Sequence, residues 1–155
     1  STSVTDGTHI FVSGGWPKNP TAAIVANGFG KVAWQNTASV DVPSMLFRDG
    51  FLPLTMDAGF AICWDAKTGR PQWKERLGGK FFTSPVMAGN RIYGTNLDGK
   101  TFVFEANPDE FKLIATNQLG DEVYASPVVS GNRLYLRVAF KNGERREFLY
   151  AIGGK

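Results

Sequence analysis

A short segment recurs along this chain at nearly constant spacing, and this repeat limits the choice of fold more than any other feature. Ser84-Pro85-Val86 and Ser126-Pro127-Val128 are the clearest copies, while Ser44-Met45-Leu46 and Ser1-Thr2-Ser3 are degenerate ones. The four copies begin 43, 40 and 42 residues apart. A period of about 40–45 residues is typical of the blades of a β-propeller, each of which contains four short strands.

Each repeat contains the same order of strands and turns, and no window shows helical periodicity. Gly paired with Asp or Asn marks the hairpin turns. The sequence therefore predicts an all-β protein, a β-propeller of four-stranded antiparallel blades. About four blade units are expected, the last one incomplete, as part of a ring of 7–8 blades. Their predicted bounds are 1–37, 38–78, 79–120 and 121–155.

The second repeat carries the best-preserved turn motif, in which Trp64-Asp65-Ala66-Lys67-Thr68-Gly69 is followed by Trp73. Gly69 can adopt the left-handed conformation that such a turn needs, and Asp65 or Thr68 can cap it with side-chain hydrogen bonds. The first repeat has a worn copy that ends at Trp34. The third repeat keeps only Phe104-Glu105-Ala106 and has lost both the Gly and the Trp.

These repeats resemble those of the pyrroloquinoline-quinone (PQQ)-type propeller family, and the resemblance covers essentially the whole chain. It implies that the motif is structural and locks one blade to the next without touching a cofactor. The residues with this implied blade-docking role are Trp34, Asp65, Thr68, Gly69 and Trp73.

The family contains both quinoprotein dehydrogenases and propellers without enzymatic activity. The vicinal cysteine pair of the dehydrogenases is missing here, and so is a Glu/Asn/Asp set for calcium. The chain looks most like the non-enzymatic, secreted bacterial branch, which implies an extracytoplasmic location, periplasmic or secreted. We therefore expect a binding or scaffold module without PQQ or calcium. The alternative is a fragment of a PQQ-dependent quinoprotein dehydrogenase.

Residues with catalytic or metal-binding chemistry are scarce. His9 is the only histidine and Cys63 the only cysteine, so the chain cannot form a metal site from several imidazoles or a disulfide of its own. No catalytic residue and no metal ligand is predicted. The net charge of +3 comes from cations scattered among acids, which predicts a solvated surface without a nucleic-acid face. No apolar run is long enough to predict a membrane span.

Aromatic residues stand just before two of the Ser-Pro-Val segments, where the chain passes from one blade to the next. In a propeller these connections share one face with the turns between second and third strands. Rigid aromatic side chains with a few charges can form a recognition surface there. The predicted binding residues are Trp16, Lys18, Phe81, Phe82, Tyr124 and Arg137. The alternatives are that Phe82 and Tyr124 wedge between blades, and that Arg137 makes a cross-strand pair.

Two hypotheses concern the partner. In the first, the chain is a piece of a longer propeller whose remaining blades complete the ring. In the second, two copies form a homodimer that closes an eight-bladed ring by two-fold symmetry. A compact four-bladed monomer would leave its last blade with three strands.

Overall fold

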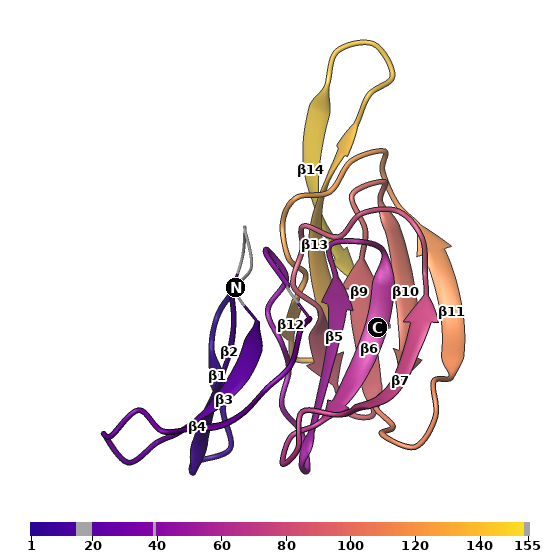
Figure 1. Ribbon diagram of the computed structural model, residues 1–155. Helices are drawn as coiled ribbons and strands as arrows, with labels where there is room; N and C mark the ends of the chain where they lie inside the picture. The colour runs from indigo at the N-terminus through magenta and orange to yellow at the C-terminus, as the bar shows by residue number, and fades with distance from the viewer. Residues whose placement is uncertain (15–19, 39, 154–155) are drawn as a thin grey trace.

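The computed structural model describes residues 1–14, 20–38 and 40–153, and these residues form four antiparallel β-sheets without a helix (Figure 1). The first sheet has the order β1-β2-β3-β4, the second β5-β6-β7, the third β11-β10-β9-β8 and the fourth β12-β13-β14. Consecutive strands pair in every sheet, as in the blades of a propeller. The all-β partial propeller predicted from the sequence is confirmed.

The strand bounds are as follows. The first sheet contains β1 (Val4–Thr5), β2 (His9–Ser13), β3 (Thr21–Val25) and β4 (Val32–Gln35). The second contains β5 (Phe51–Met56), β6 (Phe60–Asp65) and β7 (Pro71–Arg76). The third contains β8 (Val86–Ala88), β9 (Arg91–Thr95), β10 (Lys100–Glu105) and β11 (Leu113–Gln118). The fourth contains β12 (Val128–Ser130), β13 (Arg133–Phe140) and β14 (Arg146–Ile152).

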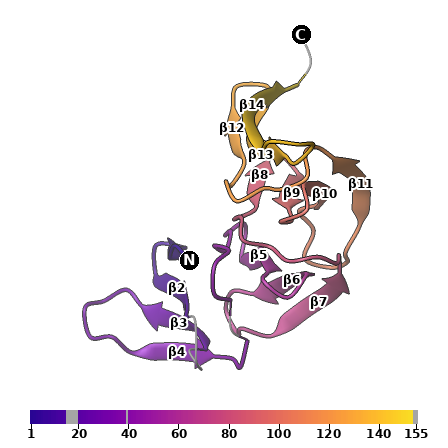
Figure 2. The same ribbon diagram turned by 90° about the horizontal axis from the view of Figure 1, so that it is seen from above.

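The four sheets follow one another in an open arc when the molecule is viewed from above (Figure 2). Within the described ranges, no strand of the first sheet packs against a strand of the fourth. The described residues therefore form a partial propeller and not a closed four-bladed ring.

The second sheet lacks the innermost strand that the sequence predicts at Ser44-Met45-Leu46. The segment still lies beside β5, because the Leu46 N–H donates to the carbonyl of Pro53 at 3.0 Å. The opposite bond cannot form, since the Pro53 nitrogen carries no hydrogen. A proline in the neighbouring strand thus reduces this blade to three full strands.

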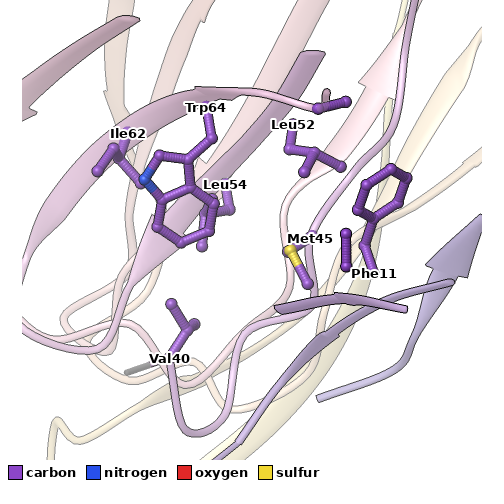
Figure 3. Close-up of a cluster of buried hydrophobic side chains, with 9 residues drawn as sticks. Phe11, Val40, Met45, Leu52, Leu54, Ile62 and Trp64 are labelled. Carbon is purple, nitrogen blue, oxygen red and sulfur yellow. The ribbon is translucent and has the colours of Figure 1, made fainter. Parts of the chain in front are cut away.

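Apolar side chains fill the spaces between successive sheets. Nine buried residues occupy the first interface (Figure 3), namely Phe11, Ala23, Val40, Met45, Leu52, Leu54, Ile62, Trp64 and Ala66. Cys63, Trp73 and Phe81 belong to the second cluster, which joins the second and third sheets. The third interface has a smaller buried cluster of Val123, Leu136 and Val138. Packing therefore weakens towards the fourth sheet.

Trp34 and Trp73 occupy equivalent places in the first two interfaces. Trp34 pairs with Ala23 in its sheet and Trp73 pairs with Cys63, each next to a β-bulge. Each indole reaches the turn of the next sheet: Trp34 Nε1 donates to the carbonyl of Ala66 and Trp73 Nε1 to that of Asn107, both at 2.8 Å. Each tryptophan therefore adds one directed hydrogen bond to the apolar contact between sheets.

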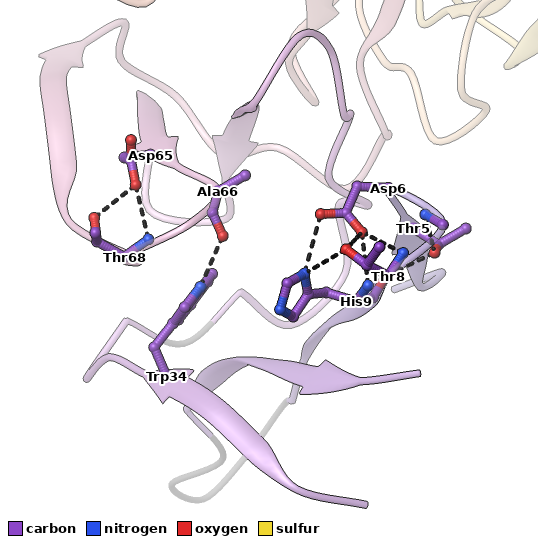
Figure 4. A network of polar contacts seen from close by, with 9 residues as sticks. Thr5, Asp6, Thr8, His9, Trp34, Asp65, Ala66 and Thr68 are labelled. Atoms are coloured by element: carbon purple, nitrogen blue, oxygen red, sulfur yellow. Dashed lines mark hydrogen bonds and ion pairs between the residues drawn. The ribbon is translucent and has the colours of Figure 1, made fainter. Parts of the chain in front are cut away.

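The turn that receives Trp34 is shaped by the residues of the repeat motif (Figure 4). The Asp65 carboxylate accepts hydrogen bonds from the backbone N–H and the hydroxyl of Thr68, both at 2.7 Å. Gly69 has a φ of +70°, and a Cβ added there would lie 2.3 Å from Cε3 of Trp34. Only glycine fits both the left-handed backbone and the indole lying against it.

Candidate functional site

Two of the predicted binding residues, Phe82 and Tyr124, lie on one end of the arc, which we call the loop face. It contains the connections between sheets and the turns between second and third strands. The two kinds of loop are bonded together: the Leu97 N–H donates to the Lys80 carbonyl at 2.7 Å, and the Val123 N–H donates to the Leu97 carbonyl at 2.9 Å. Trp16 and Lys18, which the sequence also predicts for this face, lie outside the described residues.

Phe82 and Tyr124 meet on the loop face although they come from different connections. Their rings stack with centroids 6.3 Å apart and planes inclined by 28°. Phe82 is 37% exposed and Tyr124 is 56% exposed, so the pair lies at the surface rather than in the core. Exposed aromatic side chains of this kind are frequent anchors for partners, because they bury much area at a low cost in conformational entropy.

Phe81 is placed differently from its neighbour Phe82. Its side chain is fully buried and contacts Phe102 at a centroid distance of 6.0 Å, within the cluster that joins the second and third sheets. We therefore correct its position: Phe81 is a core residue beneath the loop face and presents no surface to a ligand.

Charged side chains form a continuous network beside Tyr124. The Glu122 carboxylate lies 2.8 Å from Lys141 Nζ and 2.8 Å from Arg145 Nε. Glu147 continues the network, with Oε1 2.6 Å from Arg145 Nη1 and Oε2 accepting from Arg137 Nε at 2.8 Å. Arg137 thus makes a cross-strand ion pair with Glu147. Three cations and two carboxylates leave the network with a formal charge of +1.

The hydrogen bonds in this network change the acidity of its members. Hydrogen bonds from Lys141 and Arg145 hold the pKa of Glu122 below its ordinary value. The hydrogen bond from Arg145 does the same to the pKa of Glu147. Both carboxylates therefore stay ionised in mildly acidic solution. Because the network is exposed, its contribution is screened by salt.

A hollow of about 270 Å³ brings the aromatic and charged groups together. Its lining consists of Glu122, Tyr124, Ala125, Arg137, Ala139, Arg145 and Glu147. One wall therefore offers an aromatic ring and the other offers guanidinium groups that can bind a carboxylate or a backbone carbonyl. The sequence indicated Tyr124 and Arg137 separately, and the fold brings them to the same hollow.

The serines of the repeated segment have a role that spacing alone did not reveal. The Thr2 N–H donates to the Ser44 hydroxyl at 2.8 Å, the Ser44 N–H to the Ser84 hydroxyl at 2.9 Å, and the Ser84 N–H to the Ser126 hydroxyl at 2.8 Å. One bond of this kind crosses each sheet interface. The signal was present in the sequence, since the serine is the residue that all four copies share.

Groups with potential metal or redox chemistry are dispersed. The described residues contain no group of three or more His, Cys, Asp or Glu side chains placed to hold a metal ion. His9 Nδ1 lies 3.1 Å from Asp6 Oδ2, at the start of β2 in the first sheet (Figure 4). Burial raises the pKa of the Cys63 thiol to about 12, so it stays protonated. None of the described residues forms a helix with the length and apolarity that a membrane crossing needs.

The comparisons with known proteins agree with the propeller fold of the structure. The family model described as outer membrane protein assembly factor BamB matches residues 18–110. No curated protein matches the chain by sequence. Among solved structures, BamB from Moraxella catarrhalis superposes with a TM-score of 0.73 at 16% identity, covering 89% of this chain and 40% of that protein.

Two dehydrogenases share the same architecture. The quinohemoprotein alcohol dehydrogenase from Comamonas testosteroni gives a TM-score of 0.68 at 14% identity, over 89% of this chain and 28% of that one. A europium-containing methanol dehydrogenase gives 0.61 at 18% identity, over 76% and 24%. The chain spans less than half the length of each of these proteins. At such identities the likeness concerns the fold alone.

Proposed function

The chain belongs to the family of the outer membrane protein assembly factor BamB, and we propose that it is a non-catalytic module that binds a protein partner on its loop face. The observation that carries the proposal is the stacked pair of Phe82 and Tyr124 beside the hollow lined by Arg137, Arg145 and Glu147. Aromatic rings and arginines are the side chains most often found at the energetic centres of protein interfaces.

The chemistry of the hollow suggests how a partner is recognised. An apolar or aromatic side chain of the partner would lie against Tyr124, which is already held by Phe82. A carboxylate of the partner would compete with Glu147 for Arg137, whose side chain is largely exposed. Such an exchange of ion pairs gives orientation and a salt-dependent association rate more than raw affinity.

The location follows from the same proposal. A module that takes part in outer membrane protein assembly works outside the cytoplasm, so we propose a periplasmic or secreted location. The partner would then be a component of the assembly machinery or an outer membrane protein in transit. Trp16 and Lys18 are proposed to extend the same surface.

The test is a binding measurement with purified partners. The immobilised chain would be exposed to a purified outer membrane protein assembly complex, and Kd would be measured for the native sequence and for Tyr124→Ala. Removing a central aromatic anchor typically costs about 2 kcal/mol or more, which is roughly a thirtyfold rise in Kd. Arg137→Ala should also raise Kd, and it should make Kd less dependent on the salt concentration.

Phe29→Ala is the matched control. Phe29 is also an exposed aromatic residue, 88% accessible, but it lies in the turn between β3 and β4, away from the loop face. Its removal should leave Kd unchanged. Equal Kd values for the native chain and Tyr124→Ala, with both folded, would refute the loop face as the binding surface.

A quinone-dependent dehydrogenase is the second candidate, favoured by the structural likeness to two such enzymes. The described residues fit it poorly, because the single cysteine is buried and no carboxylate cluster is present. Titration with PQQ and Ca²⁺ decides the question. A saturable change in quinone absorbance together with a rise in melting temperature would favour the enzyme, and no response would favour the binding module.

A further inference from the structure

The three interfaces between sheets differ at one position of the repeat. Trp34 pairs with Ala23 in the first sheet and Trp73 with Cys63 in the second, and both indoles fill the space before the next sheet. In the third sheet the residue with the same register, opposite Val103 and next to the bulge, is Ala115. A methyl group therefore stands where the other interfaces have an indole.

The opposite wall of the third interface shows the consequence. Trp64 of β6 faces the first sheet and Phe104 of β10 faces the second, and each is almost completely buried. The corresponding residue of β14 is Ile152, because Leu134 pairs with Ile152 as Leu52 pairs with Trp64. Ile152 is 42% exposed. Ile152 and the small Ala115 thus face each other across this interface without a large ring between them.

A cavity of about 330 Å³ lies between these two walls. Its lining is mostly apolar and comes from both sheets, including Tyr93, Val103, Asn117, Leu119, Leu136 and Ile152. The cavity is open to solvent on one side, and an enclosed apolar cavity of about half this volume is known to bind small aromatic molecules. The cavity is therefore large enough for a small ligand, independently of what binds at the loop face.

We propose that this cavity binds a free small molecule with one planar aromatic ring system of about the size of indole. Its position in the repeat supports this, since the equivalent spaces of the two other interfaces each hold an indole ring. Two facing β-sheets leave a flat space that suits a planar molecule. Tyr93 supplies an aromatic wall.

The lining also offers a polar contact. Asn117 stands two residues after Ala115, just as Asn36 stands two residues after Trp34. The Asn36 amide donates to the Gly69 carbonyl at 3.2 Å beside the indole. The Asn117 amide, which lines the cavity, can bond a heteroatom of the ligand in the same way.

A free molecule suits the site better than the side chain of a partner protein. The lining reaches from the innermost strands, at Ala88 of β8 and Val129 of β12, to Ile152 of β14. A small molecule can occupy this depth without a backbone having to follow it between the sheets.

Indole itself is the probe for the test. Titration into the native chain, followed by isothermal calorimetry and by amide chemical shifts, should show one saturable site with the largest shifts at Tyr93, Val103 and Leu136. Ala115→Trp should fill the cavity from the third sheet and weaken indole binding at least tenfold. Ile152→Trp should do the same from the fourth sheet, and provides a second route if Ala115→Trp does not fold.

Phe29→Ala, which changes an exposed ring far from the cavity, should bind indole like the native chain. The proposal is overturned if the native chain shows no saturable binding up to the solubility of indole. It is equally overturned if either filling variant folds and binds indole unchanged, or if a tryptophan-containing peptide binds while free indole does not.

Discussion

The most informative single perturbation is the removal of Trp73 from the interface between the second and third sheets. Trp73 is almost fully buried, with 9% of its surface exposed. It lies edge-on to Phe104 at 6.2 Å and to Phe111 at 5.3 Å. Its Nε1 bonds the Asn107 carbonyl at 2.8 Å. Trp73→Ala therefore deletes a packed ring and one hydrogen bond that crosses the interface.

The expected cost can be estimated from these contacts. Truncating a buried Phe or Trp to Ala costs about 3–5 kcal/mol, the upper part of which reflects a cavity that cannot collapse. The lost hydrogen bond to the Asn107 carbonyl accounts for roughly 1 kcal/mol of this cost. We expect a loss of about 4 kcal/mol in the free energy of unfolding. Trp73→Phe keeps a ring but loses the N–H, and should cost about 1–2 kcal/mol.

Equilibrium unfolding in urea, followed by far-ultraviolet circular dichroism, measures these differences. Phe29→Ala serves as the surface control and should change stability by less than about 0.5 kcal/mol. If Trp73→Ala costs less than about 1 kcal/mol while the transition stays cooperative, the indole does not hold the two sheets together. The structural interpretation of the repeat would then be wrong.

Four further outcomes are expected. Gly69→Ala should be more destabilising than Gly30→Ala in urea unfolding, because φ is +70° and +68° at the two sites but only the Cβ at Gly69 meets Trp34; equal losses would mean that the contact has no effect. The Cys63 thiol should react with a disulfide reagent at pH 8 only as fast as the protein opens, because burial raises its pKa to about 12; rapid labelling of the folded chain would contradict this. Burial alone would raise the pKa of Asp6, but hydrogen bonds from the N–H groups of His9 and Thr8 outweigh it and lower the pKa below the ordinary 3.8. The stability that Asp6 contributes is thus present above about pH 4 and is lost on acidification. Asp6→Asn should flatten that part of the curve of unfolding free energy against pH. Light scattering across a concentration range tests the homodimer hypothesis; a single monomeric mass would exclude it.

The sheets could be predicted from the sequence because their signals are local. Alternating apolar residues and glycine turns specify each hairpin within a few residues, and the repeat supplies the same signal several times. The second sheet departs from the pattern because Pro53 lies in the strand next to the missing one, and a proline affects its neighbour's hydrogen bonds as well as its own. Spacing between repeats gives no information about that partner strand.

The candidate site was only partly predictable for a different reason. Phe81 and Phe82 are adjacent in an irregular connection, where no period distinguishes a buried ring from an exposed one. The ion pairs of Glu122 with Lys141 and Arg145 join segments about twenty residues apart, and only the tertiary fold brings them into contact. Tyr124 and Arg137 were identified by residue type, whereas the hollow that they share required the structure.

The serine bonds give the arc a direction. In each of them a backbone N–H of one unit donates to the hydroxyl of the unit that follows, so the second and third units each have one donating side and one accepting side. Successive units are therefore joined head to tail, and turning the second or the third unit around would break the serine bonds on both of its sides.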